Sequence, residues 1–301
     1  MFMKPLKSVA LRAGLATVAI ATMTILAAAA DTVVVGGKNF TEQQVLSSIT
    51  AQLLEAKGYS VDNRSGMGSV AVRQAMENGQ IDVYWEYTGT SLITYNKVKE
   101  KLSAADTYAK VKELDAKKNI VWLNPSEAND TYALAMRAPE ADKLNIHTLS
   151  ELAAHVNAKH DLTFASNAEF YARPDGLKPM EAAYGFKFER DHIKRMDSGL
   201  VYQALKNGDV DVGLVFATDG RIPAFHFTVL KDDKGYFPAY AICPVIRASV
   251  LKKHPDIGKL LNEVSAKLND KVMAALNAEV DVKKVSVENV AKEFLKKNGL
   301  I

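Results

Sequence analysis

The hydrophobic positions of this chain fall into short apolar runs that alternate with longer amphipathic stretches. The run TVVVGG at 32–37 has the pattern of a buried strand, and 41–58 has that of a helix that ends at Gly58. A second strand is expected near 59–63, and a helix closed by an Asn-Gly pair over 69–80. Because strands and helices alternate, we expect an α/β fold with mostly parallel sheets flanked by helices.

One unit of this pattern occurs twice. Residues 74–87 read QAMENGQIDVYWEY and residues 203–216 read QALKNGDVDVGLVF, so the copies start 129 residues apart (203 minus 74). Each runs from a helix through an Asn-Gly turn into a strand that ends on an aromatic residue, Tyr87 or Phe216. Chance similarity is one alternative, but the spacing suits two similar α/β lobes and is too long for a solenoid. Ligands of open α/β sheets bind at the carboxyl ends of strands, so facing lobes would bring Tyr87 and Phe216 to one cleft.

Two extended apolar patterns, at 130–137 and 236–247, are candidates for the strands where the chain crosses between the lobes. The expected division is lobe one over 31–134 plus 241–301 and lobe two over 135–240. Two C-terminal helices, expected at 255–280 and 286–300, should pack on lobe one.

The first thirty residues differ from the rest. Lys4, Lys7 and Arg12 precede an apolar run at 15–30 that ends in an Ala-x-Ala site, which is typical of a secretory signal peptide over 1–30. An uncleaved anchor is the alternative, but the run is short and no basic stop-transfer residues follow. Without its three basic residues, the chain's 38 basic and 35 acidic residues become 35 of each. We therefore expect a periplasmic protein, with neither nucleic acid nor an anionic membrane as partner.

Motifs for catalysis and metal binding are absent from the sequence. The single cysteine, Cys243, excludes an intrachain disulfide. There is no CxxC, HExxH, Gly-x-Ser-x-Gly or phosphate-loop pattern. Asp82 and Glu86 form a carboxylate pair, but their even spacing on a strand also fits a solvent or turn face. We expect no enzymatic activity, no cofactor and no metal.

Four aromatic residues fall at expected strand ends or crossings, where two lobes should meet: Tyr87, Tyr132, Phe216 and Tyr240. Each alone is more often a core residue. Several facing rings, however, attract a cation through their quadrupoles, and such a cage is the usual receptor for quaternary ammonium. Each face contributes on the order of 0.5–2 kcal/mol when desolvated. A trimethylammonium group, which has no N–H for a hydrogen-bonded salt bridge, is therefore a candidate ligand.

Two basic residues at loop positions are candidates for an anionic group. Lys38 follows the first strand in GGKNFTE, and Arg173 lies in the turn-rich EFYARPDGL. Arg offers a planar fork that suits a carboxylate. A solvated surface charge is the alternative for both. With the cage, they would suit a zwitterion that has a quaternary ammonium at one end and a carboxylate at the other.

Six segments, in order along the whole mature chain, match a known family. GGKNFTEQ, GQIDVYWEYTGT, NDTYALAMR, EFYARPDGL, FATDGRI and GYFPAYAICPVIR resemble the substrate-binding proteins of ABC importers for glycine betaine, choline and related osmoprotectants. The resemblance implies a two-lobed, type II-like periplasmic-binding-protein fold that closes on its ligand. It also implies a permease in the inner membrane, with a cytoplasmic ATPase, as partner. We expect the receptor itself to be a monomer.

The resemblance also implies site residues. The family's tyrosine box for the quaternary ammonium maps onto Tyr87, Tyr132, Tyr240 and, where the family usually has tyrosine, Phe216. Its carboxylate contacts map onto Lys38, Thr90 and Arg173. A backbone carbonyl contact to the methyl groups maps onto Asp130. Because Phe keeps a ring face but lacks the hydroxyl, choline, carnitine or another quaternary or sulfonium compound remains as open as glycine betaine.

Three other functions stay open on the sequence. A receptor for an amino acid would need an acid for the primary ammonium, and Glu86 is the only nearby candidate. A ligand-sensing component of a signalling assembly would have to act through a partner, because the chain has no DNA-binding segment. An enzyme is the third. Thermal shifts against a panel of quaternary ammonium compounds and amino acids would separate these.

Overall fold

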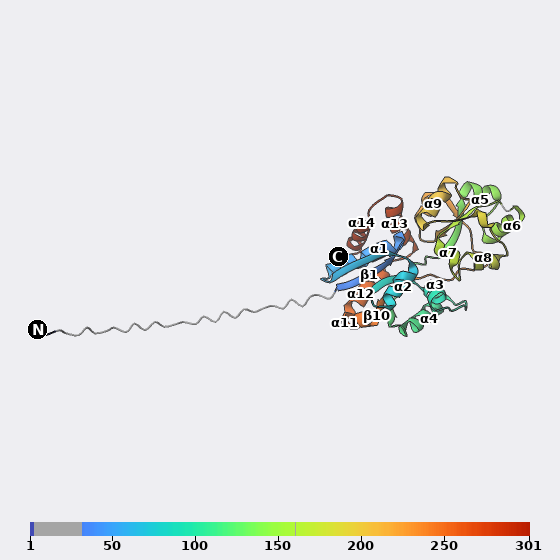
Figure 1. Ribbon diagram of the computed structural model, residues 1–301. Helices are drawn as coiled ribbons and strands as arrows, with labels where there is room; N and C mark the ends of the chain where they lie inside the picture. Colours follow the sequence, from blue (N-terminus) through green and yellow to red (C-terminus); the bar gives the residue numbers. More distant parts are fainter. Residues whose placement is uncertain (3–31, 160) are drawn as a thin grey trace. The chain divides into compact units, whose positions relative to one another are not determined.

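The computed structural model describes residues 1–2, 32–159 and 161–301 (Figure 1). The expected signal peptide over 1–30 therefore lies outside the described residues, except for its first two. The chain after it forms one compact unit to Ile301. Among the described helices, none is both long enough and apolar enough to span a bilayer.

In the part of the chain that the structure describes, ten strands form two five-stranded sheets. The first contains, in spatial order, β2 (Ser60–Met67), β1 (Thr32–Lys38), β3 (Val83–Tyr87), β10 (Ile242–Arg247) and β4 (Ile120–Trp122). The second contains β7 (Ile193–Arg195), β6 (Phe164–Ser166), β8 (Val212–Phe216), β5 (Tyr132–Arg137) and β9 (Phe227–Val229). In each sheet one strand, β10 or β5, runs against the other four. The prediction of mostly parallel sheets in an α/β fold is therefore confirmed.

Helices connect the strands and flank the sheets. In the first half these are α1 (Thr41–Ala56), α2 (Ser69–Glu77), α3 (Thr88–Thr90), the π-helix η1 (Ser91–Tyr95), α4 (Ala104–Ala116), α5 (Ala138–Leu144) and α6 (Leu149–Lys159). In the second half they are α7 (Ala168–Ala172), α8 (Leu177–Tyr184), η2 (Arg190–His192), α9 (Ser198–Asn207), α10 (Arg221–Ala224), α11 (Ala248–Lys253), α12 (Pro255–Ser265), α13 (Asp270–Asp281) and α14 (Val287–Lys297).

The repeated sequence unit is a repeated structure. In both copies a helix, α2 or α9, leads into the central strand of its sheet, β3 or β8. The glycines of the two Asn-Gly turns, Gly79 and Gly208, have φ of +76° and +83°, a left-handed conformation that glycine adopts without strain. The aspartate of each copy accepts a hydrogen bond from the neighbouring strand or its approach: Val34 N donates to Asp82 at 2.9 Å, and Thr163 N donates to Asp211 at 2.8 Å. The glycine and aspartate that the two copies share thus hold each central strand in place.

The chain crosses from the first sheet to the second between β4 and β5, and returns between β9 and β10 (Figure 1). The two crossing segments contact each other through an antiparallel bridge between Asn129 and Ala241, and Asp130 N donates to Tyr240 O at 3.2 Å. The expected boundary between 134 and 135 falls inside β5, all of which pairs with β8 and β9. The first crossing is therefore complete before Tyr132.

The single helix expected over 255–280 is two helices. The break comes at Asn269, whose side chain accepts a hydrogen bond from Val272 N at 3.0 Å and so caps α13. Both α13 and α14 pack on α1, as expected for lobe one. In addition α13 reaches the segment after β8, because a Cβ at Gly220 would lie 2.5 Å from Ala278 Cβ. The C-terminal part thus touches both halves of the molecule.

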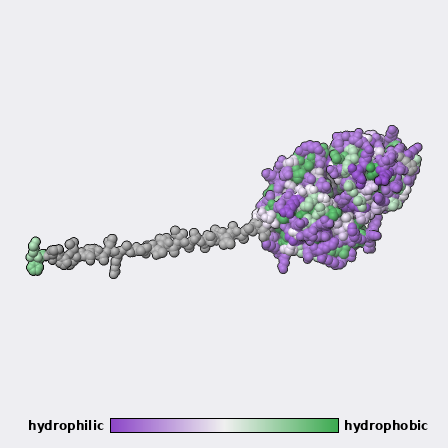
Figure 2. Space-filling model, viewed as in Figure 1, coloured by the Kyte–Doolittle hydropathy of each residue, from purple (hydrophilic) through white to green (hydrophobic). Residues whose placement is uncertain are grey.

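Buried apolar side chains fill the space between each sheet and the helices that flank it. The largest cluster includes Trp85 and Tyr87 from β3 together with Leu134 and Leu214 from the second sheet. The molecular face in Figure 2 is largely hydrophilic, with apolar side chains scattered over it. The same cluster contains Tyr132 and Tyr240, so the core is continuous with the aromatic residues described next.

Candidate functional site

A cavity of about 570 Å³ is lined by residues from both sheets. It lies where strands β1, β3 and β8 end, as expected for an open α/β sheet. Seven of the eight predicted site residues line it: Lys38, Tyr87, Thr90, Asp130, Tyr132, Phe216 and Tyr240. Residues that the sequence analysis selected from separate segments therefore lie together at one cavity.

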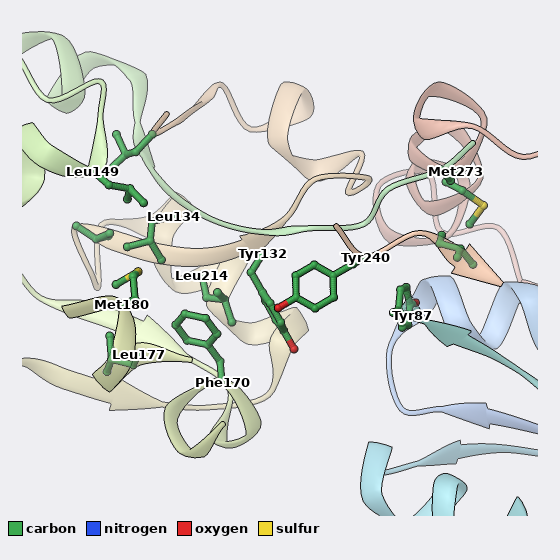
Figure 3. Packing of buried hydrophobic residues seen from close by; sticks show 14 of the residues in the cluster. Tyr87, Tyr132, Leu134, Leu149, Phe170, Leu177, Met180, Leu214, Tyr240 and Met273 are labelled. Atoms are coloured by element: carbon green, nitrogen blue, oxygen red, sulfur yellow. The ribbon is translucent and has the colours of Figure 1, made fainter. Parts of the chain in front are cut away.

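The aromatic side chains form a continuous arc along the cavity. Tyr132 has its ring centroid 5.3 Å from that of Tyr240 and 5.3 Å from that of Phe216. Figure 3 shows the Tyr132 and Tyr240 side chains next to each other, and their rings meet edge to face at 84°. Phe40 continues the arc, with its centroid 5.8 Å from Phe216 and 6.1 Å from Tyr87. These are the separations of aromatic rings in direct contact, and five rings contribute.

Hydrogen bonds fix two of the phenols. Tyr87 Oη donates to Glu42 at 2.8 Å, and Tyr240 Oη donates to Asp175 at 2.5 Å. Burial raises the pKa of the hydroxyls of Tyr87, Tyr132 and Tyr240. All three therefore stay neutral at physiological pH, and their ring faces carry the partial negative charge that attracts a cation.

Lys38 lines the cavity but is already paired. Its Nζ donates to Glu86 at 2.5 Å, and both side chains are buried. Glu86 also accepts from Tyr84 Oη at 2.8 Å and from Tyr87 N at 2.7 Å. Glu86 is thus committed to Lys38 and to the backbone of β3, which removes it as the acid that an amino-acid ligand would need. The ammonium of Lys38 has three donors, of which Glu86 uses one.

Arg173 lies behind the aromatic arc. Its guanidinium carbon is 5.2 Å from the ring centroid of Tyr132 and 5.9 Å from that of Tyr240. Asp175 accepts two hydrogen bonds from it, both at 2.7 Å, and Glu169 accepts a third at 3.0 Å. Arg173 reaches the cavity through Thr90, to whose hydroxyl it donates at 3.3 Å. Arg173 is therefore the one predicted site residue that is not among the described residues lining the cavity.

A buried acidic cluster occupies another part of the cavity wall. Thr218 Oγ1 lies 2.5 Å from Glu42 Oε2 and 2.7 Å from Asp130 Oδ1. A hydroxyl has one hydrogen, so Thr218 can donate to only one of the two carboxyl groups, and the other contact is satisfied when that carboxyl group is protonated. Burial raises the pKa of Glu42, and burial together with the Glu42 charge raises the pKa of Asp130. Both shifts favour a shared proton in this cluster in the folded state.

The sequence analysis missed Phe40, Glu42, Asp175 and Asn277. Phe40 and Glu42 follow directly on Lys38 and Asn39 at the end of β1, so the strand-end argument that selected Tyr87 would also have selected them. Asp175 is two residues after Arg173, but nothing in the sequence shows that the Asp175 carboxylate neutralises the Arg173 guanidinium. Asn277 lies inside a helix with no local signal. Within the described part of the chain, no group of His, Cys, Asp and Glu has the arrangement of a metal site.

Two lobes, each a mostly parallel sheet flanked by helices, with a ligand-sized cavity lined from both, define the two-lobed periplasmic-binding-protein fold. The family model for the substrate binding domain of the ABC-type glycine betaine transport system matches residues 31–297, and the chain belongs to this family. It is 47% identical over 280 residues to a glycine-betaine-binding protein of Pseudomonas aeruginosa, which covers 91% of this chain and 90% of that protein.

The descriptions of more distant relatives name other ligands. The chain is 34% identical to a carnitine transport binding protein of Listeria monocytogenes, over 89% of this chain and 87% of that protein. A solved structure described as a glycine betaine/carnitine/choline ABC transporter superposes with a TM-score of 0.72 at 29% identity, covering 89% of this chain and 99% of that one. The family has a binding role in transport and not an enzymatic one.

Proposed function

We propose that the protein binds a small quaternary ammonium compound in this cavity and delivers it to the permease of an ABC importer, from a place outside the cytoplasm. Glycine betaine, choline and carnitine are the candidates that the names of the relatives suggest. The observation that carries the proposal is the convergence of Tyr87, Tyr132, Phe216 and Tyr240, from different segments, on one cavity.

The charge of the cavity wall supports a ligand with a positive group. Of the described residues that line it, six are acids and two are bases. The acids are Glu42, Asp130, Glu169, Asp197, Asp219 and Asp281, and the bases are Lys38 and Arg221. Part of this excess is offset, because Glu169 pairs with Arg173. The negative charge that remains and the ring faces attract a permanent cation, which needs no hydrogen-bond acceptor.

In this proposal Lys38 and Thr90 receive the carboxylate of a zwitterion. Lys38 has donors left after Glu86, and Thr90 is oriented by Arg173. Because Asp175 and Glu169 already neutralise Arg173, its part is to hold Thr90 and the rings of Tyr132 and Tyr240 in place. We place the hinge between the lobes at the crossing segments, and Asp130 lies in one of them.

Calorimetric titration with choline and glycine betaine tests the cage. In Tyr132→Ala one ring is lost, and we expect affinity for both ligands to fall roughly five- to thirtyfold, which corresponds to about 1–2 kcal/mol. Tyr132→Phe keeps the ring and should bind nearly as well as wild type. Tyr108→Ala is the matched control, because Tyr108 is a partly buried tyrosine of α4 whose hydroxyl binds Leu123 O, away from the cavity. Equal affinities in all four proteins would exclude the cage, as would tight binding of an amino acid alone.

A further inference from the structure

Four polar side chains from four segments meet beside Tyr87 on the cavity wall. Glu42 comes from α1, Asp130 from a crossing segment, Thr218 from the turn after β8, and Asn277 from α13. Each is at most 5% exposed. A polar cluster that is buried this deeply is expected to have all of its hydrogen bonds satisfied.

The side chains of these four residues bond mainly to one another, and Tyr87 is the partner from outside the cluster. Glu42 accepts from Tyr87 Oη and pairs with Thr218 Oγ1, and Thr218 Oγ1 also pairs with Asp130. The amide of Asn277 donates through Nδ2 to Thr218 O at 3.0 Å and to Glu42 Oε2 at 3.3 Å. Because the Thr218 carbonyl can only accept, it fixes which way round the amide lies.

That orientation leaves Asn277 Oδ1 without a partner. The atom is buried and accepts no hydrogen bond from the protein, although the residue lines the cavity and is 3% exposed. Oδ1 is also the amide atom turned away from Glu42 and Thr218, since Nδ2 faces both of them. An orphaned buried acceptor in a native protein calls for a partner, and the cavity is where a ligand would supply one.

We propose that Asn277 Oδ1 accepts a hydrogen bond from the ligand, so that the cavity selects quaternary ammonium compounds that also carry an O–H or N–H donor. This inference rests on the proposed function and adds a specificity residue to it. Ring faces recognise the methylated nitrogen alone and cannot distinguish a ligand with a hydroxyl from one without it. A site built to accept a hydrogen bond does make that distinction, because its acceptor stays unpaired with the wrong ligand.

Matched ligand pairs test this. We would titrate hydroxyalkyl trimethylammonium compounds with two, three and four carbons against the alkyl compounds of the same length. Carnitine would be compared with the same compound without its hydroxyl. In wild type, at least one hydroxyl-bearing member should bind about tenfold more tightly than its partner. In Asn277→Leu, which has similar volume and no acceptor, that ratio should fall to near one. The variant also loses the amide's hydrogen bonds to Thr218 O and Glu42, and this loss should change the affinities of both members of a pair by the same factor.

Two further proteins complete the experiment. Gln44→Met removes another amide from the cavity wall, where Gln44 is only partly buried, and should keep the wild-type ratio. Asn277→Ala also lacks the acceptor and serves if the leucine does not fold. Affinity ratios near one for every ligand pair in wild type would mean that a water molecule donates the hydrogen bond to Oδ1. That result would overturn the inference while leaving the cage intact. An unchanged ratio in both Asn277 variants would also overturn it. No binding of any quaternary compound would overturn the proposed function as well.

Discussion

At the scale of single residues, the charges around the cavity are arranged before a ligand arrives. Lys38 is paired with Glu86, and Asp175 holds both Arg173 and the hydroxyl of Tyr240. The site therefore loses little side-chain entropy on binding. The sequence could select Lys38 and Arg173, because Lys38 comes at the end of an expected strand and Arg173 lies in a turn-rich segment. It could not show their partners, because Lys38 and Glu86 are 48 residues apart and meet only when β1 and β3 pair.

The proton in the Glu42, Thr218 and Asp130 cluster should make stability depend on pH. The folded state keeps a proton that the unfolded chain releases above about pH 4, since the folded pKa values of both acids are raised, by burial and for Asp130 also by the charge of Glu42. The free energy of unfolding therefore falls as pH rises from about 4 towards the folded pKa values. In Glu42→Gln the new NH₂ group can donate to Thr218 while the carbonyl accepts from Tyr87.

We expect Tm of Glu42→Gln to decline less than that of wild type between pH 5 and 8, as followed by circular dichroism. Glu100→Gln, which removes an exposed carboxylate, should follow the wild-type curve. Parallel curves for wild type and Glu42→Gln would show that the cluster does not hold a proton in this range.

At the scale of helices and strands, pattern and turn chemistry predicted most of the elements. The repeated unit could be read twice because both copies need a left-handed glycine before the central strand and an aspartate to anchor it. The break at Asn269 could not be predicted from the apolar periodicity, which continues through it. That break directs α13, and with it Asn277, to the cavity. The missed element and the missed site residue therefore have one cause.

The loop between α7 and α8 depends on one glycine. A Cβ at Gly176 would lie 1.8 Å from Phe170 O, a distance that no side chain can occupy without moving backbone. We expect Gly176→Ala to lower the free energy of unfolding in urea by roughly 2–4 kcal/mol. Because the same loop carries Arg173 and Asp175, choline affinity should fall as well.

The control for this prediction is Gly68→Ala. Gly68 has φ of −63° and no atom within 4 Å of the added Cβ, so its stability should equal or slightly exceed that of wild type. If the two variants unfold at the same urea concentration, the close approach at Gly176 is not rigid.

At the scale of the whole molecule, the sequence revealed that there are two lobes but not how they meet. The repeat and the two crossing segments established the order of the parts, yet the predicted boundary cut β5 because apolar runs do not mark where a chain changes sheets. Contacts between the lobes depend on side chains far apart in the sequence. Phe40 stacks on Phe216, Thr218 contacts Glu42, and Ser69 Oγ donates to Glu169 at 2.8 Å.

These contacts make a prediction about closure. The proposed cage takes Tyr87 from one lobe and Phe216 from the other, so a ligand should bind the state in which the lobes meet and shift the population towards it. Ser69→Ala removes one hydrogen bond between the lobes, and affinity should fall roughly two- to tenfold. The factor should be the same for choline and glycine betaine, because the change acts on the lobe equilibrium and not on either ligand. Ser60→Ala, which removes a hydroxyl contact within one lobe, should leave both affinities unchanged.

Small-angle scattering with and without saturating choline provides the direct measurement. The radius of gyration of wild type should fall when choline binds, and Ser69→Ala should need more choline to reach the same value. Closure also explains how a permease would distinguish the loaded receptor from the empty one, since only the closed state aligns surface from both lobes. A constant radius of gyration alongside calorimetrically confirmed binding would rule out this clamp. A loss in Ser69→Ala for one ligand only would instead place the Ser69 hydroxyl in contact with that ligand.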